Sequence, residues 1–169
     1  GMIYMRGQAG DYADWARATA SAEWDWPQVL PDFLAHEDLH EPRASHAQGG
    51  EWRVERQRLR WDILEDFVQA AQQAGIPLSP DFNGGDNEGV GYFEVNQRAG
   101  WRWNAAQAFL HPVRNRRNLR LWTDTPALPL WIENGRCLGA DVLHQGQRVR
   151  VRAHREVLLA LGAIGTPQL

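Results

Sequence analysis

The sequence divides at the loop Asp81-Phe82-Asn83-Gly84-Gly85-Asp86-Asn87-Glu88-Gly89-Val90-Gly91. Its four glycines, with the asparagines and aspartates among them, tolerate the positive φ angles that tight turns require. Apolar residues recur at helical spacing mainly before this loop, whereas short apolar segments separated by turn residues follow it. A helix-rich first half followed by short, mostly antiparallel strands predicts an α+β fold.

Three helices and one strand are expected before the loop. Asp11 is the expected N-cap of the first helix. Pro27 fits the first turn of the second helix, which fades near Leu39. Gly75 and Pro77 end the third and most regular helix. The expected helices span residues 11–20, 27–39 and 61–74, and the expected strand spans residues 52–56.

The second half is expected to form a strand meander. A strand at residues 90–95 follows the loop, and Asn104 is the expected cap of a short helix that runs to Leu110. Gly135 and Gly146 mark turns between antiparallel strands. The five further strand candidates span residues 119–122, 128–132, 140–143, 148–152 and 157–161.

Length, charge and composition limit the possible classes of protein. A chain of 169 residues is long enough for one core, so residues 1–169 are expected to form a single domain. The net charge of -3 and the lack of a basic stripe argue against a nucleic-acid partner. No apolar run approaches the roughly 20 residues of a membrane span, so no membrane partner is expected. Cys137 is the only cysteine, which excludes an internal disulfide and favours a cytoplasmic protein.

One motif suggests a zinc hydrolase. His36-Glu37-Asp38-Leu39-His40 matches the His-Glu-x-x-His pattern, and His46 lies where one class of zinc proteases has a third ligand. On a helix, His36 and His40 would share a face one turn apart, and Glu37 would activate a zinc-bound water.

Three neighbouring features weigh against that site. Pro42 truncates the helix that must hold His40, and Arg43 stands where a glycine turn is needed. No methionine follows that could supply the turn beneath such a zinc ion. The sequence therefore favours solvent-facing histidines at a frayed helix end and no metal site, with the zinc hydrolase as a remote alternative.

The order of motifs resembles the glucose-methanol-choline (GMC) family of FAD-dependent oxidoreductases over essentially all 169 residues. Members of that family that act on choline or other alcohols are the nearest in pattern. The shared motifs are Gly1 to Gln8, Asp11-Tyr12-Ala13-Asp14-Trp15, Trp24 to Phe33, Asp81 to Gly91, Gly100 with Arg102 and Ala105 to Leu110, and Gly162 to Gln168.

The resemblance implies a cofactor and its contacts. Met2, Ile3 and Tyr4 would follow the loop over the flavin ring, where backbone amides donate hydrogen bonds to the flavin. The main chain of Ala127 would contact the adenine, and Gly162 with Ala163 would run beside the adenosine half. Gly1 fits the family's Asn-Gly-Met order, although a cleaved expression tag leaves the same residue.

The resemblance also implies what residues 1–169 lack. The family's Gly-x-Gly-x-x-Gly fingerprint and its catalytic histidine have no counterpart among them, so we expect an internal segment of a larger enzyme with no catalytic residue of its own. Such a segment would bind FAD weakly if at all and would be inactive by itself. It would cover its apolar surface by forming a homo-oligomer or by binding a complementary subunit; a non-catalytic module that associates in this way is the second hypothesis.

Overall fold

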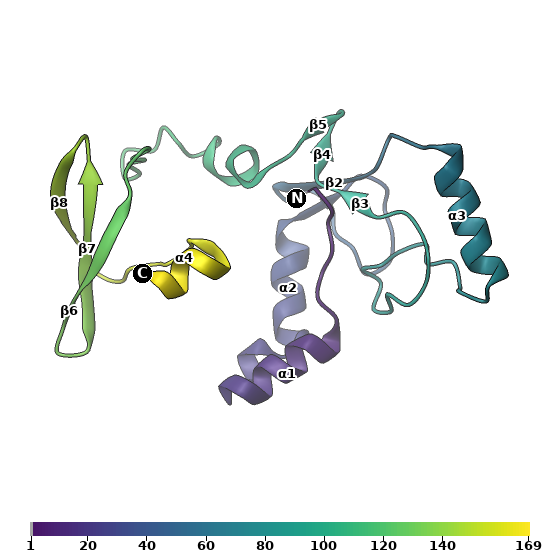
Figure 1. The fold of residues 1–169 in the computed structure, drawn as a ribbon, viewed down its shortest axis with the longest axis horizontal. Helices are drawn as coiled ribbons and strands as arrows, with labels where there is room; N and C mark the ends of the chain where they lie inside the picture. The colour runs from purple at the N-terminus through teal and green to yellow at the C-terminus, as the bar shows by residue number, and fades with distance from the viewer. Residues whose placement is uncertain (1) are drawn as a thin grey trace. The chain divides into compact units, whose positions relative to one another are not determined.

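A computed structural model describes residues 2–169, so the expectation for Gly1 lies outside the described residues. The chain forms two compact units, Gly1–Asn115 and Arg116–Leu169, where the sequence predicted one domain (Figure 1). The first unit carries the main helices and the second carries the strand meander. The expected α+β class is confirmed.

Two helices begin the first unit. The first, α1 (Ala9–Thr19), starts earlier than expected, because Gln8 is its N-cap and Asp11 is the third residue of a reciprocal capping box. The second, α2 (Trp26–His36), is capped by Asp25 and ends at His36, three residues before the expected end. A short 3-10 helix, η1 (Ala22–Trp24), joins them. The residues after α2 are extended and form a strand.

A small sheet forms the centre of this unit. The strand β1 (Glu37–Leu39) pairs in parallel with β2 (Trp52–Arg56), and β2 pairs antiparallel with β3 (Glu94–Val95). The prediction at residues 52–56 is therefore confirmed, whereas the expected strand at 90–95 is reduced to two residues. Leu39 and Val54 pack with Tyr4 as the buried hydrophobic cluster of the described residues.

The remaining elements of the first unit lie around this sheet. The helix α3 (Asp62–Gln73) confirms the expected 61–74 helix. A hairpin of β4 (Gln97–Arg98) and β5 (Trp101–Arg102) follows β3. The short π-helical turn η2 (Ala106–Leu110) begins as expected, because the Asn104 side chain accepts a hydrogen bond from the Gln107 amide at 3.0 Å.

The second unit is the expected meander. The strands β6 (Ala127–Glu133), β7 (Arg136–His144) and β8 (Gln147–Arg152) pair antiparallel in the order β6-β7-β8. Both hairpins turn through a left-handed pair, Asn134-Gly135 and Gln145-Gly146, whose φ angles lie between 50° and 77°. This geometry matches the twist of two-residue hairpins. The chain ends in α4 (Gly162–Gln168).

Two expected strands are wrong. Residues 119–122 and 157–161 have no regular structure. Trp122 stacks on His144 at 4.4 Å between ring centroids, which uses its apolar surface in a side-chain contact. Residues 157–161 form a short apolar run without the alternation that identifies a strand, and periodicity alone does not classify such runs.

Gly50 gives a direct test of how α2 passes into β1. A Cβ atom at Gly50 would lie 2.2 Å from the His36 carbonyl oxygen, so the backbones must separate if the residue becomes alanine. Gly50→Ala should lower the free energy of unfolding by about 1 to 3 kcal/mol. Gly10→Ala is the matched control, because Gly10 lies in α1 with open space around it. Urea unfolding of both variants measures the difference, and equal stability would contradict the close approach.

Candidate functional site

The segment Met2–Tyr4 is held in place by the edge of β3. The Tyr4 amide donates to the Glu94 carbonyl at 2.8 Å, and the Asn96 amide donates to the Met2 carbonyl at 2.6 Å. Ile3 lies between these two bonds, opposite β3 in an antiparallel bridge. In such a pair the central residue makes no bond to its neighbour, so the Ile3 amide faces away from β3.

The exposure of this segment changes along its length. Met2 is 36% exposed and Ile3 is 58% exposed, whereas Tyr4 is buried. The segment is therefore fixed at Tyr4 and presents Met2, Ile3 and the Ile3 amide outward. Among the described residues the Ile3 amide donates no hydrogen bond, and the resemblance implied a backbone amide of this kind for a flavin contact.

A buried ion pair fixes the chain immediately after Tyr4. Arg6 Nη2 lies 2.7 Å from Glu37 Oε2, and the two side chains are 1% and 0% exposed. The Arg6 backbone amide donates to Asn83 Oδ1 at 2.7 Å, and its guanidinium donates to the Ser45 carbonyl at 2.9 Å. The N-terminal segment, the start of β1 and two loops thus meet at one arginine.

His46 extends this cluster to the loop that divides the sequence. Its Nδ1 lies 2.9 Å from Glu37 Oε1, and its Nε2 lies 2.9 Å from Asp81 Oδ2. The hydrogen bond to Glu37 raises the pKa of His46 above its usual value despite burial. Burial alone would raise the pKa of Glu37, but hydrogen bonds from His46 and the Ala47 amide, with the charge of Arg6, lower it.

Tyr4 gives a pH-dependent prediction, because burial raises the pKa of its phenol to about 12. The folded protein favours the neutral, protonated phenol over the charged phenolate. The stability that comes from this preference is complete below the unfolded pKa of about 10 and is lost as the pH rises through about 12. Its full size is about 2 to 3 kcal/mol. Tyr4→Phe should therefore flatten the fall in unfolding free energy above about pH 9. Urea titrations at several alkaline pH values measure the free energy of unfolding of both proteins. The same dependence on pH in wild type and variant would contradict the burial of the phenol.

The structure separates the histidines of the His-Glu-x-x-His motif. His36 is the last residue of α2 and His40 follows β1, so they do not share a helical face. The side chain of His36 is 61% exposed, and His40 is also exposed. The expectation of a solvent-facing side chain is confirmed for these two and wrong for His46, whose side chain is 1% exposed. A strand follows α2, so the frayed helix end does not form.

The second unit brings Ala127 close to the C-terminal segment. Ala127, Leu161 and Gly165 line one pocket of about 410 Å³ with four neighbouring residues. Gly162 and Ala163 lie between two of these lining residues at the start of α4 but are not themselves in the lining. Gly162 has a φ of 82°, which favours glycine at this turn. Of the residues expected near the adenosine half, Ala127 lines this pocket, and Gly162 and Ala163 only adjoin its lining in sequence.

Sequence reasoning missed the polar cluster itself. Arg6, Asp81 and Glu94 were not expected to be site residues, although Arg6 and Asp81 lie in quoted family motifs. The sequence offered one signal for this cluster. Arg6 is a charged residue among apolar neighbours, and Asp81 begins a glycine-rich loop. Arg6 and Glu37 are 31 residues apart along the chain, and His46 and Asp81 are 35 residues apart. No local sequence pattern shows contacts over such separations.

None of the described helices has the length and apolar character needed to cross a membrane.

Residues 1–169 match the family described as GMC oxidoreductase. Mitochondrial choline dehydrogenase of Mus musculus is 39% identical over 170 residues, which are 99% of this chain and 28% of the relative. Alcohol dehydrogenase [acceptor] of Pseudomonas putida is 36% identical over 172 residues, 99% of this chain and 31% of the relative. The chain thus spans less than a third of the length of these curated relatives.

Solved structures share the fold. Pyridoxine 4-oxidase from Mesorbium loti has a TM-score of 0.83 and 29% identity, over 89% of this chain and 30% of that chain. An FAD-dependent oxidoreductase from Chaetomium thermophilum has a TM-score of 0.90 and 22% identity, over 99% of this chain and 32% of that chain. With the family match over residues 1–169, these similarities show that the chain belongs to the GMC oxidoreductase family.

Proposed function

We propose that the chain is part of an FAD-dependent oxidoreductase that oxidises the CH–OH group of an alcohol, as the names of its dehydrogenase relatives suggest. The flavin, when bound, accepts the hydride from that carbon. In this chain Met2 and Ile3, held in place by Tyr4, would contact the flavin side, and Ala127, Gly162 and Ala163 would contact the adenosine side. We assign no catalytic residue here, because none of the chain's histidines matches the family's catalytic position.

One observation carries the proposal. The Ile3 amide faces away from β3 on a segment that both β3 and the Arg6–Glu37 pair fix. A donor on such a rigid backbone costs little to orient, which is what a hydrogen bond to a flavin ring requires. The chain alone would bind FAD weakly, because its sequence contains no Gly-x-Gly-x-x-Gly turn to hold the pyrophosphate.

A chimera tests the proposal. The residues of the Pseudomonas putida relative that align with this chain are replaced by the chain, and flavin content and alcohol-dependent dye reduction are measured. We expect both to be retained. Ile3→Pro in the chimera removes the outward amide without removing a bond to β3 and should lose flavin. Ile3→Leu keeps the amide and is the control.

The outcomes separate the parts of the proposal. A chimera that binds flavin with either variant would contradict the role of the Ile3 amide. A folded chimera without flavin would contradict the cofactor assignment as a whole. The isolated chain should stay colourless after incubation with FAD, and a yellow, near-stoichiometric preparation would contradict the expected weakness. The cytoplasmic location remains a prediction from the lone Cys137.

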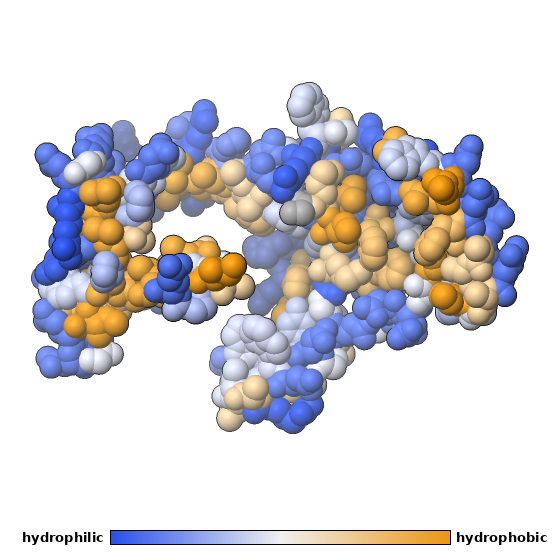
Figure 2. Space-filling model, viewed as in Figure 1, coloured by the Kyte–Doolittle hydropathy of each residue, from blue (hydrophilic) through white to orange (hydrophobic). Residues whose placement is uncertain are grey.

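A second candidate is a non-catalytic module that associates with its own copy or with a complementary subunit. The chain exposes 12760 Å² of surface. A globular monomer of 19.2 kDa would expose about 8,400 Å², and two separate globular units of these lengths about 10,000 Å². Large hydrophobic residues are exposed on both units, and Figure 2 shows hydrophobic surface over α3 and over α4. Self-association is the simplest way to cover such a surface.

A further inference from the structure

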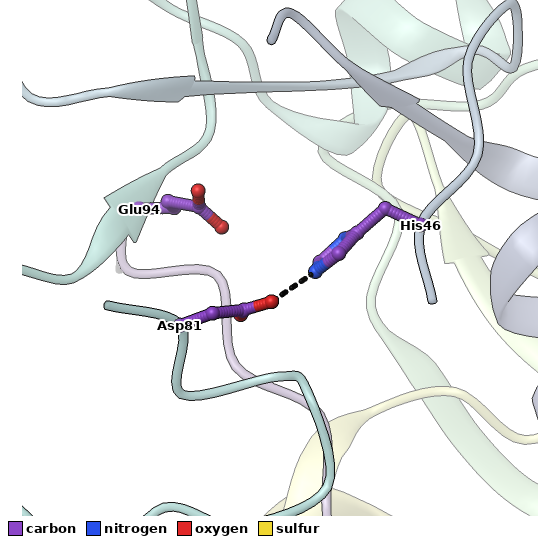
Figure 3. Close-up of side chains that lie close together, drawn as sticks. All are labelled: His46, Asp81 and Glu94. Atoms are coloured by element: carbon purple, nitrogen blue, oxygen red, sulfur yellow. Dashed lines mark hydrogen bonds and ion pairs between the residues drawn. The ribbon is translucent and has the colours of Figure 1, made fainter. Parts of the chain in front are cut away.

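Three potential metal ligands converge beside the ion pair. His46, Asp81 and Glu94 each offer one ligand atom, and these atoms lie within 4.8 Å of one another. Figure 3 shows the side chains pointing toward a common space from three separate segments of the chain. A nitrogen and two carboxylate oxygens at this spacing are compatible with coordination of one ion.

Glu94 supplies an independent indication of a ligand. Its side chain is 6% exposed, and Arg43 pairs with Oε1. The other oxygen, Oε2, is buried and has no hydrogen-bond partner among the described residues. A buried carboxylate oxygen without a donor is costly, and a bound cation satisfies it.

The orientation of His46 suits a metal ligand. Glu37 Oε1 lies 2.9 Å from Nδ1, and Nε2 faces Asp81; in the tautomer with the proton on Nδ1, Glu37 accepts that proton and Nε2 can bind an ion. Metal-binding histidines are typically fixed in this way by a carboxylate on the far ring nitrogen. The Glu37 carboxylate also makes the imidazole more basic, so that Nε2 binds a metal ion more strongly.

The charge of the cluster favours a cation. Glu37, Asp81 and Glu94 carry three negative charges. Arg6 and Arg43 carry two positive charges and pair with Glu37 and Glu94. The carboxylates therefore exceed the arginines by one charge in a largely buried cluster, and a proton on His46 or a bound cation balances it.

A pocket borders the cluster. A pocket of about 240 Å³ is lined by Glu94, Arg43, Ser79 and Pro80 among other residues. Its wall therefore contains one of the three ligand residues and lies next to a second, since Pro80 precedes Asp81.

We propose that His46 Nε2, Asp81 and Glu94 bind one divalent transition-metal ion such as zinc, with water completing the coordination. An imidazole with carboxylates suits such an ion better than magnesium, which prefers oxygen ligands and retains its waters. The ion has a structural role, because it would link the loop at Asp81 to β3, the strand that also holds Met2–Tyr4. This site shares only His46 with the zinc hydrolase motif.

Zinc content tests the site. The full chain is stripped with a chelator, incubated with zinc or magnesium, desalted and analysed for metal, and its melting temperature is measured. We expect one zinc per chain, a higher melting temperature with zinc, and no change with magnesium. Glu94→Gln and Asp81→Asn should each weaken zinc binding at least about tenfold. Asp81→Asn keeps an oxygen that accepts from the Asn83 amide, so the loop should still form.

A matched control excludes binding elsewhere. The double variant His36→Gln/His40→Gln removes the two exposed histidines and should retain the zinc. The proposal is overturned if the wild-type chain retains no zinc, which would mean that a protonated His46 alone balances the cluster. It is also overturned if zinc persists in both Glu94→Gln and Asp81→Asn, or is lost only in the double variant. Circular dichroism of the zinc-free variants verifies that each is folded.

Discussion

Glu37→Gln should lower the free energy of unfolding by about 3 to 5 kcal/mol, because it removes one partner of a fully buried ion pair. The carboxylate accepts from Arg6 at 2.7 Å and from the Ala47 amide at 2.7 Å, and it lies 2.9 Å from His46. The neutral amide leaves Arg6 as a buried charge without compensation. Its NH2 group would also face donors where an acceptor is required. Urea unfolding at neutral pH measures the loss.

An exposed pair gives the matched control. Arg17 and Asp14 pair on the surface of α1, with side chains 77% and 68% exposed. Asp14→Asn should change the unfolding free energy by less than about 1 kcal/mol, because solvent screens such pairs. A similar small loss in Glu37→Gln would show that the Arg6–Glu37 pair is not the buried junction described above.

The sequence predicted the elements whose signals are local. The apolar spacing and the Gly75 stop predicted the third helix, and α3 follows it closely. The glycine turns of the meander also formed as expected, because a left-handed pair can be recognised from Asn-Gly and Gln-Gly. Both features depend only on residues within a few positions of each other.

The errors have non-local causes. The chain after His36 reads as a continuing helix, but it pairs with β2 across a gap of more than ten residues. His46 reads as a surface residue, but Glu37 and Asp81 bury it between two carboxylates. Tertiary contacts thus overrode local propensity at the point where the polar cluster forms.

The same reasoning applies to the site. The resemblance named Met2, Ile3 and Tyr4 but gave no reason why a short N-terminal segment should be rigid. The reason is the pairing with β3 together with the ion pair at Arg6, whose partners are distant in sequence. A motif can therefore point to a segment, while only the structure identifies what holds that segment in place.

The chain should form a dimer at tens of micromolar, and charges on α3 should dissociate it. Ile63 and Phe67 lie one turn apart on α3 and are 70% and 65% exposed, with Leu64 beside them. Leaving such side chains in water forfeits roughly 1.5 to 3 kcal/mol each. A two-fold dimer lets the same face cover its own copy. Ile63→Glu/Phe67→Glu would place two negative charges from each protomer in that interface.

We expect the double variant to weaken association at least about thirtyfold, since truncating a central apolar contact costs about 2 kcal/mol and buried like charges add to this. Gln69→Glu is the control, because it adds a charge on the opposite face of α3. Sedimentation velocity over a range of concentrations measures the dimer. The substitutions should not unfold the chain, because both side chains are exposed in the isolated unit. A wild-type chain that stays monomeric at tens of micromolar would contradict the predicted self-association through this face.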